Sequence, residues 1–583
     1  MNTDKLNHGL HRCLRQHGKL GQNSRIHKHL CLRSSLCLSV VKFSSSLCCP
    51  IIGVHPWLFL TVSSLLDISS NLQYTYPDMH TTFSALPLDM NGLTIHFTGI
   101  KGTGMTALVE VCKERGASIT GSDVEDTFYT DQILSSLGIK ALPFDEKNIS
   151  SNINVLFYSS AYDVNTHCEL VKARELSIPM MEYSEALGKV SESAYSCGIA
   201  GVHGKTTTTG MTGTILQELD LKSQVLAGSA IASFGGTCTM NKGTDIFVAE
   251  TCEYKRHFLH FHPQKILLTS IESDHQDYFP LYSDILKAFC EYIELLPKNG
   301  TLIFCAADKG ACEAVTISMK TRPDISYIPY GTSSPDFEKL QKLYAFTPKY
   351  LVKKHSIANS FQTFTLEGID TEFILKVPGF HNVLNAAGSI ALCIELIKEK
   401  RSYDDADALT IKNALEKFTG SKRRSEIIGI TRTPPAVFID DYGHHPTAVK
   451  VTIEGFKSFY PDYLLIADFM SHTYSRTHAL LDEFASSFNA ADEVILHKIY
   501  SSAREKKEDF EGKVSGRILF DKTKMHNSQV KYFEEVLDAK DYVIDRLNKS
   551  LPDGKKGYVF VTMGAGDNWK LGKAVFEQIS GNK

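Results

Sequence analysis

Residues 197–209 read Cys197-Gly-Ile-Ala-Gly-Val-His-Gly-Lys-Thr-Thr-Thr-Thr209, an apolar run followed by a glycine turn and a stretch typical of a helix start. Gly201 and Gly204 permit positive φ angles and close approach of the backbone, so backbone amides can surround a polyphosphate. The Lys205 ammonium would reach the β- and γ-phosphates, and the Thr206 hydroxyl would face Mg²⁺. The segment therefore predicts a phosphate-binding loop between a strand and a helix.

The match to the phosphate-loop pattern G-x-x-x-x-G-K-[ST] is incomplete, because Ile199 stands where the pattern has its first glycine. A glycine turn that only starts a helix is the alternative interpretation. The position of the turn between a strand and a helix favours the phosphate loop.

Two further segments carry groups suited to a metal or a phosphate. Asp245-Ile-Phe-Val-Ala-Glu250 is an apolar strand that ends in an acid, and Ile266–Thr269 is a strand followed by His275. Ligands of open α/β sheets bind outside the carboxyl ends of the strands. We therefore expect Glu250 to offer a carboxylate to the metal, with His275 at the same edge. A loop histidine alone is more often a capping residue, so its ligand role depends on the phosphate loop before it.

From Gly92 onward, short apolar runs alternate with amphipathic stretches, which is typical of βαβ units and of an α/β fold with a mainly parallel sheet. Three blocks are predicted, at 90–192, 193–419 and 420–583. The second block contains an insertion at 327–377 that alternates like an antiparallel sheet. The third block repeats the rhythm with strands at 436–439, 463–467, 493–496 and 558–562.

A second glycine turn, Gly99-Ile-Lys-Gly-Thr-Gly104, follows a strand and opens a helix. Asp123 comes near the spacing of an acid that binds a ribose, which invites a nicotinamide interpretation. The glycines, including Gly102, run G-x-x-G-x-G rather than G-x-G-x-x-G. That order, with a nucleotide loop downstream, argues against NAD.

The first 89 residues differ in composition from the rest. Residues 1–90 contain eight Lys or Arg and four Asp, a net charge of +4, whereas the whole chain of 583 residues carries −4. The first Glu is Glu110, and five of the 14 cysteines precede residue 50. A targeting segment is one interpretation, but Pro50 and Pro56 interrupt the uncharged run and the basic leader is long. We expect an atypical extension, disordered or not translated, with translation starting at Met79 or Met90.

The composition also limits the classes of binding partner that the chain is expected to have. A near-neutral chain with 43% hydrophobic and 22% charged residues is ordinary globular usage without general attraction to nucleic acid or an anionic membrane. We expect no nucleic-acid partner and no stable membrane association. The cysteines after residue 50 lack C-x-x-C pairs and His/Cys ligand spacing, which predicts buried thiols in the reducing cytoplasm and no zinc-type cluster.

Taken together, the motifs resemble the Mur ligase family, and within it the branch that adds alanine. The resemblance runs from about Asn91 to the C-terminus. The matching segments, in the order of the family, are His96–Met105, Gly201–Thr209, Glu250–Phe258, Glu272–Tyr278, Gly379–Asn385, Phe418–Arg424, Asp440–Pro446, His472–Thr477 and Gly564–Asp567.

The resemblance implies three domains: an N-terminal Rossmann-like UDP-binding domain, a central P-loop-type ATPase domain, and a C-terminal Rossmann-like domain that closes over the site. It implies that the carboxylate of UDP-N-acetylmuramate attacks the γ-phosphate of ATP, and that L-alanine then displaces phosphate from the acyl phosphate. Negative charge develops on phosphoryl oxygens in both steps, which explains a lysine and divalent cations, Mg²⁺ or Mn²⁺. Oligomeric state is not implied.

The resemblance also implies roles for individual residues. Catalysis depends on Lys205, Glu250 and His275, and the metal ions on Thr206, Glu250 and His275. The nucleotide is bound by Gly201, Val202, His203, Gly204, Lys205, Thr206, Thr207, Asn382, Asn385, Arg424 and Asp440. The substrates are bound by Gly99, Gly102, Gly104, Asp123, Tyr442, His444, His445, His472 and Arg476. Arg476 suits the carboxylate of alanine, since its planar fork can bind both oxygens. Asn382 is equally suited to a helix N-cap.

Departures from the family leave two alternatives. The carbamylated lysine of some relatives would fall near Phe289, with Lys287 out of step, so no carbamate is predicted. Lys101 and Lys255 differ from common family choices. One alternative is a sister ligase that attaches a preformed murein tripeptide to UDP-N-acetylmuramate. The other is a nucleotide-binding regulator without catalysis, against which the intact Lys205, Thr206, Glu250 and His275 argue.

Overall fold

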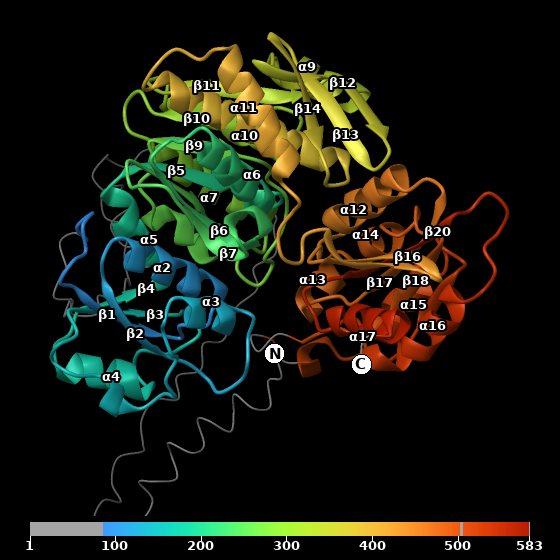
Figure 1. Cartoon of the computed structure of the whole chain (residues 1–583), viewed down its shortest axis with the longest axis horizontal. Helices are drawn as coiled ribbons and strands as arrows, with labels where there is room; N and C mark the ends of the chain where they lie inside the picture. Colours follow the sequence, from blue (N-terminus) through green and yellow to red (C-terminus); the bar gives the residue numbers. More distant parts are fainter. Residues whose placement is uncertain (1–85, 502–504, 506, 582–583) are drawn as a thin grey trace, which may run out of the picture. The chain divides into compact units, whose positions relative to one another are not determined.

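A computed structural model describes residues 86–501, 505 and 507–581 (Figure 1). The predicted N-terminal extension, up to residue 85 and including Met79, lies outside the described residues. The described part is an α/β fold with three sheets, of four, ten and six strands. The predicted α/β class with mainly parallel sheets is confirmed.

The first sheet has the order β2-β1-β3-β4, and all its pairings are parallel. Its strands are β1 (Thr94–Thr98), β2 (Ser118–Ser122), β3 (Val155–Tyr158) and β4 (Met180–Glu182). Its helices are α2 (Thr103–Glu114), α3 (Thr130–Ser136), α4 (Cys168–Glu175) and α5 (Tyr183–Glu192).

The second sheet has the order β14-β13-β12-β11-β10-β9-β5-β8-β6-β7. Its strands are β5 (Tyr195–Ala200), β6 (Ser223–Ile231), β7 (Thr237–Asn241), β8 (Ile246–Glu250), β9 (Lys265–Leu268), β10 (Thr301–Cys305), β11 (Ser326–Thr332), β12 (Tyr350–Ala358), β13 (Phe361–Leu366) and β14 (Ile369–Leu375). The helices of this part are α6 (Lys205–Glu218), α7 (Tyr282–Glu294), α8 (Lys309–Thr321), α9 (Pro335–Tyr344), α10 (Phe380–Lys398) and α11 (Asp405–Lys417).

The predicted antiparallel insertion is smaller than the sequence pattern indicated. Strand β11 pairs in parallel with β10, and β12 pairs in parallel with β11. Only β12–β13 and β13–β14 are antiparallel in this region. Helix α9 lies between β11 and β12 in the chain and provides the crossover that a parallel pair requires. The expectation for 327–349 was therefore wrong.

The third sheet has the order β15-β16-β20-β17-β18-β19, parallel except for β15 against β16. Its strands are β15 (Glu426–Arg432), β16 (Pro435–Asp441), β17 (Tyr463–Phe469), β18 (Glu493–Leu496), β19 (Val530–Tyr532) and β20 (Gly557–Met563). The helices are α12 (Pro446–Phe459), α13 (Tyr474–Ala479), α14 (Leu481–Ser486), α15 (Gly516–Thr523), α16 (Lys540–Leu547) and α17 (Trp569–Ser580).

Helix α10 is a largely apolar helix in the hydrophobic core beside the second sheet. By length and composition it could cross a membrane, but 78% of its apolar window is buried inside the protein. It packs against α6, the helix that follows the glycine turn. Burial of this kind identifies a core helix of the fold, which holds α6 in place.

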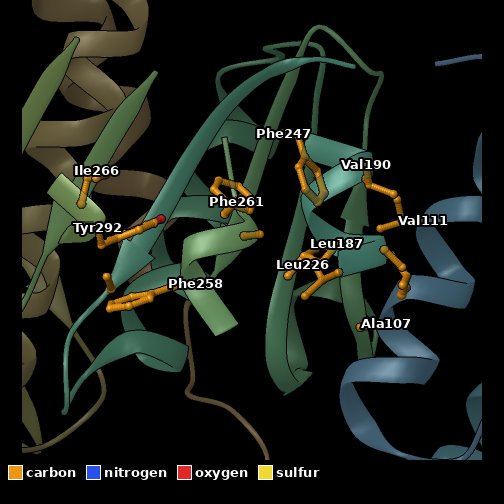
Figure 2. Packing of buried hydrophobic residues seen from close by; sticks show 14 of the residues in the cluster. Ala107, Val111, Leu187, Val190, Leu226, Phe247, Phe258, Phe261, Ile266 and Tyr292 are labelled. Carbon is orange, nitrogen blue, oxygen red and sulfur yellow. The ribbon is translucent and has the colours of Figure 1, made fainter. Parts of the chain in front are cut away.

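An apolar joint connects α2 to the second sheet. Ala107 and Val111 of α2 face Leu226 of β6 and Phe247 of β8, beside Leu187 and Val190 of α5 (Figure 2). The buried Arg115 lies over the Phe247 ring at 5.5 Å, and its Nε donates to Gln224 Oε1 at 3.0 Å.

Candidate active site

The glycine turn joins β5 to α6 at the centre of the second sheet, where β5 lies between β8 and β9. Gly204 is the N-cap of α6 with φ +82°, and Gly201 has φ +136°. A Cβ added at Gly204 would lie 2.5 Å from Asn385 Oδ1. A side chain at this position would therefore both strain the backbone and press on α10.

The backbone amides of the turn are not equivalent. Val202 N donates to Ser270 O at 2.9 Å, and His203 N donates to Ser270 Oγ at 3.0 Å. These two amides brace the turn against the loop after β9. The first amides of a helix have no intrahelical partner. The amides available for an anion are therefore those at the start of α6, from Gly204 to Thr207.

Lys205 is held by a carboxylate that the sequence did not single out. Its Nζ donates to Glu253 Oε2 at 2.9 Å and also to the carbonyl of Gly201. Glu253 Oε1 lies 3.4 Å from His275 Nε2. Glu253 is only 1% exposed, and although burial opposes its charge, Lys205 and His275 hold its pKa below the ordinary value. Glu253 thus connects the lysine and the histidine.

Glu250 ends β8 and lies opposite Ile199 of β5 in the register of the sheet. Its Oε2 accepts a hydrogen bond from Gly228 N at 2.8 Å. Thr206, in the first turn of α6, is 5% exposed. Both residues line one cavity of about 820 Å³, a size that suits a nucleotide.

This cavity collects many of the predicted site residues. Those lining it are Val202, His203, Gly204, Lys205, Thr206, Thr207, Glu250, Asn382, Asn385, Arg424, His444 and His445. Predicted residues outside its lining are Gly201, His275, Asp440, Tyr442, His472, Arg476, Gly99, Gly102, Gly104 and Asp123.

Asn382 and Asn385 lie on the first turns of α10, as predicted, but Asn382 is not the N-cap. That position belongs to Gly379, with φ +91°. Asn382 Nδ2 donates to Pro378 O at 2.7 Å, and Asn385 Nδ2 donates to Asn382 Oδ1 at 3.0 Å. The two buried amides thus support each other at the cavity wall.

Of the two adjacent acids at the end of β16, Asp441 lines the cavity and the predicted Asp440 does not. Asp440 accepts hydrogen bonds from Arg423 Nε at 2.9 Å and from Thr562 Oγ1 at 2.9 Å. Asp441 lines the cavity and accepts from the backbone amides of Gly443 and Ser425, each at 2.7 Å.

Tyr442 organises the arginines of this edge. The guanidinium carbon of Arg423 lies 5.2 Å from the centroid of the Tyr442 ring, and that of Arg424 lies 5.1 Å from it. Arg424 lines the cavity, whereas Arg423 turns to Asp440. A guanidinium over an aromatic ring is favourable, so Tyr442 positions Arg424 without lining the cavity itself.

His444 and His445 precede α12 and are held uncharged by their surroundings. Burial, with the nearby Arg476, lowers the pKa of His444 well below its ordinary value. Burial, with the neighbouring His203, lowers the pKa of His445 to about 4. His444 Nδ1 lies 2.9 Å from Tyr442 O. Neutral imidazoles offer lone pairs for hydrogen bonding or metal binding.

Arg476 forms a buried ion pair with Asp274. Its Nε and Nη2 both donate to Asp274 Oδ1, at 2.9 and 2.7 Å, and both residues are about 5% exposed. Despite burial, Arg476 and the nearby histidines hold the pKa of Asp274 well below its ordinary value. His472 lies near Tyr500, with ring centroids 5.8 Å apart. The cation predicted for the amino acid is thus bound by a carboxylate of the chain.

The first glycine turn lies at the end of β1, apart from this cavity. Gly99 has φ +88°, and a Cβ there would lie 2.7 Å from the Tyr162 ring. Asp123 accepts from the amides of Lys101 and Val124, each at 2.7 Å. The Asp123 carboxylate therefore braces the turn.

Sequence reasoning missed four acids of the site: Glu253, Glu272, Asp274 and Asp441. Glu253 lies three residues after Glu250 in the same loop, and Glu272 and Asp274 precede His275. Their positions at or just after the carboxyl ends of β8, β9 and β16 were a usable signal. The partners that give them their roles are distant in sequence and could not be read from it.

Comparison with known proteins gives consistent matches along the chain. The family model described as Mur ligase family, catalytic domain, matches residues 94–195. The Mur ligase middle domain matches residues 199–393, and the Mur ligase, glutamate ligase domain matches residues 423–566.

Two similar sequences and one similar structure belong to proteins with the same name. The UDP-N-acetylmuramate–L-alanine ligase of Treponema pallidum is 46% identical over 493 residues, covering 84% of this chain and 98% of the relative. That of Borrelia garinii is 36% identical, covering 83% and 99%. A crystal structure of the UDP-N-acetylmuramate–alanine ligase of Thermotoga maritima matches with TM-score 0.65 and 23% identity, covering 84% and 100%.

Proposed function

The chain belongs to the Mur ligase family, and from this premise we propose that it joins L-alanine to the carboxylate of UDP-N-acetylmuramate with cleavage of ATP to ADP and phosphate. The three-domain architecture is that of the family. The observation that carries the reaction is the cavity in which Lys205, Thr206 and Glu250 meet Asn385 and Arg424. The product is a precursor of peptidoglycan, the polymer of the cell wall that determines cell shape.

The chemistry follows from the poor reactivity of a carboxylate. An oxygen of the muramate carboxylate attacks the γ-phosphorus of ATP, and ADP leaves. The amine of L-alanine then attacks the carbonyl carbon of the acyl phosphate. Inorganic phosphate leaves together with the former carboxylate oxygen to which the phosphoryl group was transferred, and the nitrogen loses a proton. Negative charge grows on phosphoryl oxygens in both steps, where the Lys205 ammonium and the amides at the start of α6 stabilise it.

A divalent cation fits this donor set. The Thr206 hydroxyl and the Glu250 carboxylate offer the hard oxygen ligands that Mg²⁺ or Mn²⁺ prefers, and both line the cavity. His275 offers a nitrogen next to Glu253. When bound, the cation would neutralise charge on the phosphates. The carboxylates of Glu250 and Glu253 supply the negative charge that attracts it to this edge of the sheet.

Residues 420–583 contribute the other half of the site. Arg424 keeps its predicted role beside the nucleotide. We assign the acid next to it to Asp441 instead of the predicted Asp440, because Asp440 accepts a hydrogen bond from Arg423. We assign the uridylyl-muramate contacts to His444, His445 and the turn at Gly99–Gly104, and the alanine carboxylate to Arg476. His472 is assigned to the amino-acid pocket on its sequence position alone.

The boundaries of the three domains and the location of the reaction are part of the proposal. We place the boundaries at 192/193 and 419/420, between α5 and β5 and between α11 and β15. The cysteines of the described residues are all free, which supports the reducing cytoplasm as the location.

The test is phosphate release from ATP in the presence of UDP-N-acetylmuramate, with alanine, glycine, serine or the murein tripeptide added in turn. We expect release with alanine above all. Release only with the tripeptide would instead identify the sister ligase, and no release with any acceptor would leave the nucleotide-binding regulator.

A further inference from the structure

Three metal-ligating side chains meet at the edge of the cavity, from segments far apart in sequence. They are His203 of the glycine turn, Glu272 of the loop after β9, and His445 before α12. One ligand atom of each lies within 4.8 Å of the others. His203 Nε2 is 2.9 Å and His445 Nδ1 is 3.6 Å from Glu272 Oε2. The two imidazole rings have centroids 4.9 Å apart.

The hydrogen bonds of His445 fix which nitrogen carries its proton. Its Nε2 lies 3.2 Å from the carbonyl oxygen of Ser273. A carbonyl only accepts, so Nε2 carries the hydrogen and Nδ1 presents a lone pair. Nδ1 accepts one long hydrogen bond, from the Thr447 amide at 3.4 Å. The Glu272 carboxylate, which is also an acceptor, lies 3.6 Å from the same atom, and a cation between the two acceptors would stabilise this arrangement.

A hydrogen bond to the second carboxylate oxygen of Glu272, Oε1, holds this side chain in position. Thr447 Oγ1 donates to Glu272 Oε1 at 2.7 Å, which leaves Oε2 directed to both histidines. A ligating carboxylate held by an outer hydrogen bond is typical of metal sites in proteins. The Ser273 carbonyl plays the same part for His445.

We propose that His203, Glu272 and His445 form a binding site for a transition-metal dication of the Zn²⁺ class. Two imidazoles and one carboxylate are a common donor set for Zn²⁺, whereas Mg²⁺ prefers oxygen ligands. Ligands of a tetrahedral zinc ion, bound at about 2.0–2.1 Å, lie roughly 3.3 Å apart. The two distances at Glu272 Oε2, 2.9 and 3.6 Å, lie on either side of that value.

The site is separate from the magnesium ligands assigned to Thr206, Glu250 and His275, with which it shares no residue. All three of its residues line the same cavity, so a water or a phosphate oxygen can complete the coordination. A metal here would join the glycine turn to the segment that starts α12. It would therefore hold residues 445–447 against the phosphate loop.

The experiment is a titration of the full-length, nucleotide-free protein with Co²⁺, whose visible absorption reports coordination, followed by displacement with Zn²⁺. Histidines and cysteines before residue 50 can bind metal as well, so the readout is the difference between variants. We expect Glu272→Gln and His445→Ala to lose one equivalent of Co²⁺ relative to wild type. The lost component should lack the charge-transfer absorption of thiolate ligands.

Glu272→Gln is the deciding variant, because it keeps the size of the side chain and the hydrogen bond from Thr447. Loss of an outer-sphere partner already weakens metal binding about 10–100-fold, so loss of this ligand should weaken it at least about 100-fold. The exposed His526→Ala serves as the matched control and should bind like wild type. Equal stoichiometry and affinity in wild type and Glu272→Gln would overturn the proposal. Circular dichroism confirms folding, since His445 also caps α12.

Discussion

At the scale of single residues, the two cations assigned to the substrates are both bound by carboxylates of the chain. Lys205 pairs with Glu253, and Arg476 pairs with Asp274. All four are largely buried, so each pair has given up hydration that its partner must replace. Removing one partner leaves an uncompensated charge in the interior, which makes the role of each pair testable apart from catalysis.

We expect Lys205→Met to abolish phosphate release and to lower the free energy of unfolding by about 3–5 kcal/mol, because Glu253 is left buried without a cation. Urea denaturation measures the stability and the phosphate assay measures the activity. The double variant Lys205→Met/Glu253→Gln should regain most of the stability and none of the activity. A stable but inactive single variant would contradict the stabilising role of the pair.

Arg476→Ala should mainly raise the KM for alanine, by roughly 30-fold or more, because loss of a buried ionic partner costs about 2–5 kcal/mol. The KM for ATP should change little. Steady-state kinetics with each substrate varied in turn separates the two, and the exposed Arg517→Ala of the same part of the chain is the control. A lower kcat with an unchanged KM for alanine would refute this assignment.

The chemistry of the site was predictable from residue types, but the partners were not. The turn with Gly201, Gly204 and Lys205 was predictable because its spacing is local. Asp440 and Asp441 are adjacent at the end of β16, and alternation in a strand sends their side chains to opposite faces. Sequence could not tell which face meets the cavity, since that depends on Arg423 and Thr562.

At the scale of elements, β5, the glycine turn and α6 form a unit whose geometry depends on Gly204. Its φ of +82° is one that residues with a Cβ rarely adopt, and Asn385 of α10 closes the space beside it. The unit is therefore constrained from two sides, by its own backbone and by the helix packed against it.

Gly204→Ala should weaken ATP binding at least tenfold and destabilise the protein by about 1–2 kcal/mol. Gly138→Ala is the matched control, because Gly138 has φ +71° with open space around the position of a Cβ. It should lose less stability than Gly204→Ala, because only its backbone is strained, and it should bind ATP unchanged. Calorimetric titration with ATP, together with thermal unfolding, measures both effects; equal loss of ATP binding in the two variants would refute the role of Asn385.

Elements with continuous apolar runs were predictable, and exposed elements were not. Strands β5, β16, β17, β18 and β20 have buried patterns that match the predicted runs. Strand β15 was missed because it lies at the edge of its sheet, with Ile427 51% and Ile430 66% exposed. Such a strand has no buried run to signal it, and its position depends on its antiparallel partner β16 and on helix α17 packed against it.

At the scale of the whole molecule, the joint between α2 and the second sheet contains an acid. Glu110 of α2 is 5% exposed and accepts from Cys238 N of β7 at 3.2 Å. Burial raises its pKa to about 7, against the opposing effect of hydrogen bonds from Cys238, Thr239 and Thr237. The contact is therefore sensitive to pH near neutrality.

Because the folded pKa of Glu110 lies above its unfolded value of 4.5, the folded state holds its proton longer than the unfolded chain. Stability from this group is complete below pH 4.5 and is lost as the pH rises through about 7, by roughly 3 kcal/mol at most. Glu110→Gln should therefore be more stable than wild type at pH 8 and nearly equal to it at pH 4.5. Urea denaturation across this range, with the exposed Glu114→Gln as control, checks it; no growth of the difference with pH would contradict it.

Glu253 and Asp274 pair with the two cations that we assign to the substrates, so ligand binding under that assignment is an ion exchange. Each incoming phosphate or amino-acid carboxylate competes with a tethered anion whose effective concentration is set by the fold. A small anion that makes only one contact gains little from such an exchange. ATP gains more, since it adds contacts with the amides at the start of α6 and with the cavity walls, and so the two ion pairs favour ATP over small anions.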